Sequence, residues 1–255
     1  MSEILAAILK SVPDGWQGQH LYVGANWTIS IVQNAAGEQR AGLAATPGPE
    51  QVAKQARFQP GFNQVTGQDA IELAQYAQSA EPVVAAVGLA TLNALLQPDS
   101  KLLEDIDAAD WLVEHGRNRQ VAVVGRFPFI EELQPVVANL WVFELNPQPH
   151  EYGAEQAALI IPQADIVAIT SSTLVNHTLD ALLALVRPPT KVMLLGPTTP
   201  LSPLLFDFGV DLLSGTQVVN IETVLASIQQ GVTFRKMAGL HRVTLQKRVS
   251  ANSVV

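Results

Sequence analysis

The chain has 255 residues, a formal net charge of -8, 15% charged residues and no cysteine. A chain of this length can bury a sizeable core in one or two domains. The absence of cysteine excludes disulfides, thiolate zinc sites and a cysteine nucleophile. The acidic balance argues against a nucleic-acid partner, because phosphate backbones are bound by dense lysine and arginine surfaces.

Residues 1–98 have the pattern of a small α+β domain. The opening MSEILAAILKSVPDGW predicts an ordinary helix and lacks the basic start of a signal peptide. Residues 19–46 alternate apolar and polar residues between turns, which predicts an antiparallel meander, and helical patterns follow at 68–79 and 82–97. The apolar run at 82–96 is shorter than the roughly 20 residues that span a bilayer. We therefore expect a cytoplasmic protein without a membrane partner.

Residues 99–255 change to a different pattern. Short apolar runs recur with helical stretches between them, namely QVAVVG, LWVFEL, DIVAIT, KVMLLG and GVDLLSG. This alternation predicts a Rossmann-like parallel sheet with crossover helices, and so an α/β fold class for the chain. In the tail, HRVTLQKRV favours an edge strand that points its charges to solvent. A basic arm is the alternative.

Ligands of open parallel sheets bind beyond the carboxyl ends of the strands. The first such end, VVGRFPF, stands where a dinucleotide-binding fold carries its three glycines and retains only Gly125. We therefore expect no standard NAD site. Glu144 ends the second strand and matches the acid that hydrogen-bonds a ribose diol, although a solvated loop residue is an equally good interpretation.

The third strand end, TSSTLVNHT at 170–178, holds more hydroxyl groups than one helix cap needs. It can offer hydroxyls and backbone N–H groups to one polar or anionic ligand, and the alternative is a generous cap with His177 exposed. A metal at His177 is disfavoured, because no second histidine or paired acid stands four residues on. The fourth end runs from Gly196 to Thr199 among prolines, which stiffen a loop.

These segments together resemble the putative heavy-metal chelation family. The resemblance rests on VGLATLNALL, VAVVGRFPFI, VFELNP, ADIVAITSSTLVNHTLDALL and LLGPTTPLSPLLFDFGVDLLSG, in this order. It implies an enolase-N-terminal-like domain joined to a Rossmann-like domain, with an active site between them. It also draws attention to Asn93, a polar residue in an apolar helix that needs a partner. Family members usually carry Thr-Gly-Ser at the third strand end, whereas this chain has Thr170, Ser171 and Ser172, which restricts backbone approach at 171.

We therefore predict an α+β domain over 1–98 and an α/β domain with a C-terminal tail over 99–255. A small polar or metal-chelating molecule would bind between them, with or without turnover. Glu144 and His177 are the candidate acid/base pair. The candidate ligand-binding residues are Asn93, Gly125, Phe127, Thr170, Ser172, Asn176, Gly196 and Thr199.

Three further expectations concern ligands and partners. Neutral hydroxyl and amide groups suit an organic anion better than a bare cation, so we expect any metal to arrive within a small chelate. The alternative function is a nucleotide-dependent enzyme that uses the Rossmann-like domain for a modified nucleotide or a ligand like S-adenosylmethionine. The sequence is compatible with a homo-oligomer and does not decide the oligomeric state.

Overall fold

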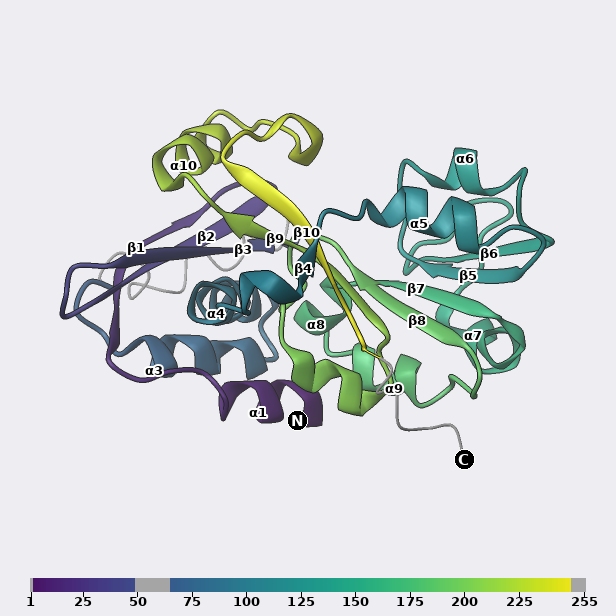
Figure 1. Cartoon of the computed structure of the whole chain (residues 1–255), viewed down its shortest axis with the longest axis horizontal. Helices are drawn as coiled ribbons and strands as arrows, with labels where there is room; N and C mark the ends of the chain where they lie inside the picture. Colours follow the sequence, from purple (N-terminus) through teal and green to yellow (C-terminus); the bar gives the residue numbers. More distant parts are fainter. Residues whose placement is uncertain (1, 49–64, 249–255) are drawn as a thin grey trace.

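The computed structural model describes residues 2–48 and 65–248 (Figure 1). In its N-terminal part the elements are α1 (Glu3–Leu9), β1 (Trp16–Val23), β2 (Trp27–Asn34), β3 (Gln39–Ala45), α3 (Ala70–Gln75), η2 (Tyr76–Gln78) and α4 (Pro82–Leu95). These are followed by η3 (Ser100–Leu102), β4 (Leu103–Glu104), α5 (Ala108–His115), β5 (Gln120–Val124), α6 (Ile130–Leu133), β6 (Asn139–Phe143), α7 (Ala154–Ile160) and η4 (Ile161–Gln163). The last are β7 (Ile166–Thr170), α8 (Ser172–Val175), α9 (Leu179–Leu183), β8 (Lys191–Leu195), η5 (Pro203–Phe208), β9 (Leu212–Val218), α10 (Ile221–Gln229), η6 (Phe234–Lys236) and β10 (Leu240–Gln246).

The predicted meander forms a sheet of its own. Strands β1, β2 and β3 pair antiparallel in that order, with Trp27 opposite Ala45 at one end of the β2–β3 ladder. Helix α4 covers one face of this sheet and α10 the other (Figure 1). Almost every side chain of α4 is buried, as expected for a helix that is apolar on all sides. The expected antiparallel meander is confirmed.

The second sheet has seven strands in the order β4-β10-β9-β8-β7-β5-β6. Strands β6, β5, β7, β8 and β9 are parallel, so the α/β fold class is confirmed. Successive residues of β7 pack on opposite faces of the sheet. Ile166 and Ala168 pack with α5 and α6, whereas Val167 and Ile169 belong to the main core. Because β6 and β7 flank β5 on opposite sides, the strand order reverses beside β5. This reversal is where such sheets bind ligands.

The two parts of the chain share one hydrophobic core. Buried residues of α1 and α4 belong to the same cluster as Val167 of β7 and Leu245 of β10. Hydrogen bonds also cross between the parts: the Asp180 carboxylate accepts from the Ser2 hydroxyl at 2.7 Å, and the Thr198 hydroxyl accepts from the Ala45 amide at 2.8 Å. The division into 1–98 and 99–255 stays a proposal, since one large cluster of buried residues spans both parts.

The tail differs in part from the expectation. Strand β10 pairs along its length with β9, and it also meets two residues of β4 at Thr244 and Leu245. It is therefore an edge strand only over its first half, and the short β4 covers the rest. Residues 249–255 of the tail lie outside the described residues. Within the described ranges, no helix is long and apolar enough to cross a membrane.

Candidate functional site

A pocket of about 380 Å³ lies at the carboxyl ends of β5, β6 and β7, beside the reversal of strand order. We call it the strand-end pocket. Its lining is Val124, Gly125, Arg126, Phe127, Phe143, Glu144, Leu145, Ala154, Ala157, Thr170, Ser172, Thr173, Asn176, Thr178 and Leu182. Six of the ten predicted site residues are in this set, namely Gly125, Phe127, Glu144, Thr170, Ser172 and Asn176. They come from three separate strand ends, which the fold brings together.

Gly125 fixes the approach of β5 to β7 at the base of the pocket. Its φ is 106°, and a Cβ there would lie 3.0 Å from Cβ of Thr170. A side chain at this position is therefore strained by the backbone angle and crowded by its neighbour. Thr170 in turn receives a hydrogen bond from the Ser172 amide at 3.3 Å, while its carbonyl accepts one from the Thr173 hydroxyl at 2.6 Å. These contacts hold the hydroxyl-rich turn against the strand end.

Arg126 and Glu151 form a bidentate ion pair at the rim. Arg126 donates from Nε to Oε1 at 2.8 Å and from Nη2 to Oε2 at 2.6 Å, and the Gln148 amide also donates to Oε2 at 2.7 Å. The Arg126 bond, with the Gln148 amide second, lowers the pKa of Glu151 to about 2, and the Glu151 bond raises the pKa of Arg126 above its ordinary value. The charge of Glu144 raises the pKa of Arg126 further, so the two side chains lie near each other in the pocket.

The ion pair predicts an unusual titration of Glu151. Since its pKa is lowered in the folded protein, the pair's contribution to stability is complete above the ordinary carboxyl pKa near 4.5 and disappears as pH falls from there through about 2. We expect the side-chain carboxyl carbon of Glu151, followed by NMR, to titrate near pH 2. A midpoint near 4.5 would show that the pair does not persist in solution.

Two residues of the α8–α9 segment behave differently from each other. Asn176 lines the pocket, and its Oδ1 accepts from the amide of Thr178 at 3.2 Å and from its hydroxyl at 2.7 Å. His177 has a φ of 57°, and its Nε2 donates to the carbonyl of Ser79 at 2.7 Å. His177 is absent from the lining of the strand-end pocket, so the structure does not bring it together with Glu144 there. Their acid/base pairing stays a prediction.

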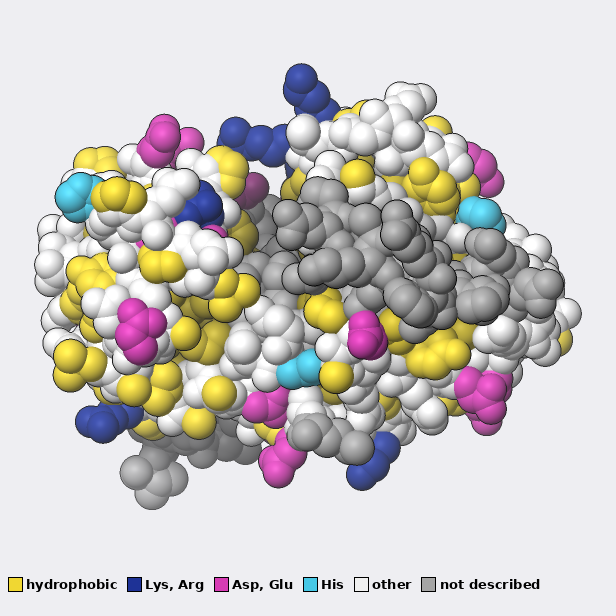
Figure 2. Space-filling model, turned by 180° about the vertical axis from the view of Figure 1, so that it is seen from behind, with side chains coloured by type: hydrophobic (Ala, Val, Ile, Leu, Met, Phe, Trp, Pro, Cys, Tyr) yellow, Lys and Arg dark blue, Asp and Glu magenta, His cyan; other side chains and the backbone are white. Residues whose placement is uncertain are grey.

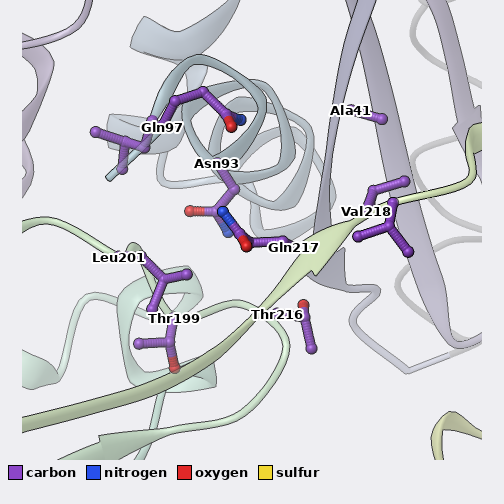
Figure 3. Close-up of a pocket in the computed structure, with 10 residues that line it drawn as sticks. Ala41, Asn93, Gln97, Thr199, Leu201, Thr216, Gln217 and Val218 are labelled. Carbon is purple, nitrogen blue, oxygen red and sulfur yellow. The ribbon is translucent and has the colours of Figure 1, made fainter. Parts of the chain in front are cut away.

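The three other ligand-binding candidates do not line the strand-end pocket. Asn93 and Thr199 line a second pocket of about 170 Å³ between β3, α4 and β9, which we call the Asn93 pocket (Figure 3). Gly196 lines neither pocket; its φ is 121°, and a Cβ there would stand 2.9 Å from Oγ of Ser171. Eight of the ten predicted residues therefore divide between two separate pockets, and Gly196 and His177 line neither.

The donor set does not favour a bare metal ion. Within residues 2–48 and 65–248, no group of three or more histidine, aspartate or glutamate side chains could hold one. The strand-end pocket itself contributes one carboxylate, from Glu144, and one arginine. Transition metals are usually held by converging imidazole, thiolate or carboxylate groups. That a metal would enter as part of an organic complex stays a prediction.

Comparison with known proteins identifies the family. Two family models match the chain, over residues 14–96 and 107–247, and both are described as "Putative heavy-metal chelation". The second alone covers more than half of the chain. The protein belongs to this family. The resemblance found in the sequence is thus confirmed, and the family description points to binding.

The chain is similar to two solved proteins of unknown function from the DUF364 family, the family of the second model. The protein from Desulfitobacterium hafniense is 25% identical, with a TM-score of 0.82 over 96% of this chain and 98% of the other. The one from Pyrococcus horikoshii is 22% identical, with a TM-score of 0.78 over the same shares. An uncharacterised protein of Methanocaldococcus jannaschii is 28% identical over 161 residues, which are 60% of this chain and 62% of that relative. The first two likenesses support the fold.

Arg126 and Thr178 are lining residues that the sequence did not mark as ligand-binding. In the sequence, Arg126 is only one of the residues that replace the glycine-rich pattern of a dinucleotide-binding site. Its orientation depends on Glu151, 25 positions later, and no local pattern connects the two. Thr178 was visible within the hydroxyl-rich stretch, but its place in the pocket depends on the turn made at Asn176 and His177.

Proposed function

We propose that the strand-end pocket binds a small organic anion with metal-chelating groups, and that a metal reaches this protein within such a chelate. The observation that carries the proposal is the convergence of six predicted residues and Arg126 on one pocket of about 380 Å³. The family description, which concerns metal chelation, supports a binding role. The proposal makes the organic part of the complex the recognised group.

The chemistry of the lining fits such a ligand. Arg126 provides the positive charge, because a guanidinium pairs with carboxylate or phosphate in a defined geometry. Hydroxyls of Ser172 and Thr170 provide neutral hydrogen-bonding groups, and Phe127 with Leu182 contributes an apolar wall. Pockets for small molecules commonly combine an apolar wall with a few fixed polar groups. Glu144 can then accept from a hydroxyl or amine of the same ligand.

Three probes test the proposal by calorimetry and thermal denaturation: citrate, its Ni²⁺ complex and Ni²⁺ alone. We expect citrate and the complex to bind and to raise the melting temperature. Bare Ni²⁺ should raise it little, because stabilisation by a ligand falls away when its concentration is below the Kd. A larger shift with bare Ni²⁺, removed by His177→Ala, would contradict the proposal. So would the failure of both citrate and its Ni²⁺ complex to bind.

Arg126→Gln should weaken the binding of citrate about tenfold, which corresponds to ~1.4 kcal/mol. The substitution removes the charge but retains a polar side chain of moderate length. Arg119→Gln is the matched control, because Arg119 is exposed and precedes β5 at the amino end of the same sheet. Equal loss of affinity in the two variants would mean that only net charge matters, and that Arg126 does not contact the ligand.

The alternative function, a nucleotide-dependent enzyme, has one specific observation in its favour. Gly125 and Glu144, which end adjacent strands, lie in the same pocket beside the reversal of strand order. The stacked rings of Phe127 and Phe129, with centroids 5.0 Å apart, stand where the fingerprint would have its other glycines. Such a ligand would have to approach the sheet without the usual pyrophosphate contacts.

NAD and NADP should accordingly bind no better than about millimolar, or close to 4 kcal/mol. The missing glycines leave side chains where the backbone must approach the pyrophosphate. Isothermal calorimetry is the direct measurement. Micromolar affinity for either dinucleotide would show that the nucleotide alternative is the better one.

A further inference from the structure

The Asn93 pocket differs in chemistry from the strand-end pocket. Its ten lining residues are Ala41, Asn93, Leu96, Gln97, Thr199, Leu201, Thr216, Gln217, Val218 and Val219. None of these side chains carries a charge, and five have an oxygen atom. The volume of about 170 Å³ has room for a single small ion with a few waters, at about 30 Å³ per water.

Asn93 presents an oxygen that has no partner. Both hydrogens of its Nδ2 are used, one donated to the carbonyl of Leu43 at 2.8 Å and one to the carbonyl of Thr198 at 3.1 Å. Since both partners are carbonyls, the orientation of the amide is fixed, and Oδ1 can only accept. This Oδ1 is buried and without a hydrogen bond. In Figure 3 the side chain extends from α4 into the pocket.

Thr199 provides a second unpartnered oxygen. The residue is 2% exposed, and its Oγ1 makes no hydrogen bond in the structure. Its backbone is held by the bond from its amide to the carbonyl of Gly196 at 3.0 Å. Gly215 permits β9 to pack against this loop, because a Cβ there would lie 3.1 Å from the carbonyl oxygen of Thr199. Two buried polar atoms of one pocket are thus left unsatisfied, which is uncommon in folded proteins.

Further oxygen atoms can reach the same place. Thr216 and Gln217 are half-buried on β9 and line the same pocket as Asn93 (Figure 3). Gln97 is exposed at the end of α4, so its amide can turn either way. Leu96, Gln97 and Leu201 also line an adjoining groove, which gives a route from solvent.

We propose that the Asn93 pocket binds a monovalent cation, potassium or ammonium, through Asn93 Oδ1, Thr199 Oγ1 and neighbouring neutral oxygens. Neutral oxygens are hard donors without charge, as in the carbonyl sites that take potassium. A divalent ion would lose its hydration shell with no carboxylate to compensate. An organic anion would find no cationic side chain. The site is independent of the strand-end pocket and of the proposed function.

The test compares melting temperatures in potassium, ammonium and choline chloride at equal ionic strength. We expect potassium or ammonium, at about tenfold above the Kd, to raise the melting temperature by roughly 2–4 °C over choline. Equilibrium dialysis with radioactive rubidium, a stand-in for potassium, should show one ion retained per chain. Equal melting temperatures in all salts, together with no retained rubidium, would overturn the proposal.

Thr199→Val separates a cation site from a mere packing defect. The hydroxyl has no partner, so valine should leave the protein folded and raise its melting temperature in choline. With the cation site lost, the extra effect of potassium and the retention of rubidium should both disappear. Thr28→Val is the matched control: its hydroxyl is fully buried and bonded to that of Thr46 at 2.9 Å. It should lower the melting temperature equally in every salt. Rubidium retained unchanged by Thr199→Val would also count against the site.

Discussion

Asn93→Asp should destabilise the protein by about 3 kcal/mol at neutral pH. The native amide donates both of its hydrogens, to the carbonyls of Leu43 and Thr198, so that one side chain of α4 joins β3 to the loop after β8. An ionised carboxylate has the same shape but cannot donate. It would place a negative oxygen against two carbonyl oxygens in a buried site, where unpaired charge is costly. Urea denaturation measures the difference.

The destabilisation by Asn93→Asp should also depend on pH in a defined direction. A carboxyl surrounded by acceptors has its pKa raised above the unfolded value near 3.9, because the folded state disfavours its charge. The penalty is therefore full at high pH and shrinks as pH falls through the raised folded-state pKa, where the protonated group can donate one hydrogen bond.

Asn176→Asp is the control for Asn93→Asp. The Asn176 Oδ1 already accepts from Thr178, and a carboxylate keeps that role. It should stay within about 0.5 kcal/mol of the native protein. Equal effects at the two positions would show that the bonds of Asn93 do not join the parts of the chain.

The strands of the parallel sheet were predictable, because a strand buried on both faces is a run of consecutive apolar residues. In β7, residues 166–169 are all apolar, since alternate side chains enter different cores above and below the sheet. The order of the strands leaves no such pattern. Nothing in KVMLLG states that β8 lies beside β7, or that β6 is at the far edge. Consequently the sequence predicted that strand ends gather, but it did not predict which ones share a pocket.

This missing order explains how the predicted site divided. Gly125, Glu144 and Thr170 end three neighbouring strands and meet in the strand-end pocket. Thr199 follows β8 and turns toward α4 and β9, where it meets Asn93. The sequence predicted that Asn93, a polar residue in an apolar helix, needs a hydrogen-bond partner. It did not predict which one, because both partners lie more than 40 positions away.

His177 shows most clearly what a local sequence pattern cannot predict. His177 stands inside the hydroxyl-rich stretch at 170–178, yet its backbone has a φ of 57° and its ring donates to the carbonyl of Ser79, far back in the sequence. Neither composition nor spacing predicts a positive φ in a residue other than glycine.

The absence of a nucleic-acid partner stays a prediction. On the face shown in Figure 2, Lys and Arg side chains form only small, separated groups.

The other large effect is expected at Gly88, in the middle of α4. By helix propensity alone, Gly88→Ala should stabilise the protein by about 1 kcal/mol. The structure predicts the opposite sign, because a Cβ at this position would overlap the backbone of Ala77 and Tyr76 in η2. Backbone cannot rotate away as a side chain can, so α4 and η2 would have to separate. We expect a net loss of about 3 kcal/mol, at the upper end of overpacking costs.

Gly48→Ala distinguishes this overlap from a general effect of replacing glycine. A Cβ at Gly48 meets nothing within 4 Å, so that variant should match the native protein or gain up to about 1 kcal/mol. Urea denaturation of the three proteins gives the comparison. Because α4 carries Asn93, its displacement in Gly88→Ala should also reduce rubidium retention. A neutral Gly88→Ala would mean that α4 can shift on η2, and that the close packing of this helix does not hold Asn93 in place.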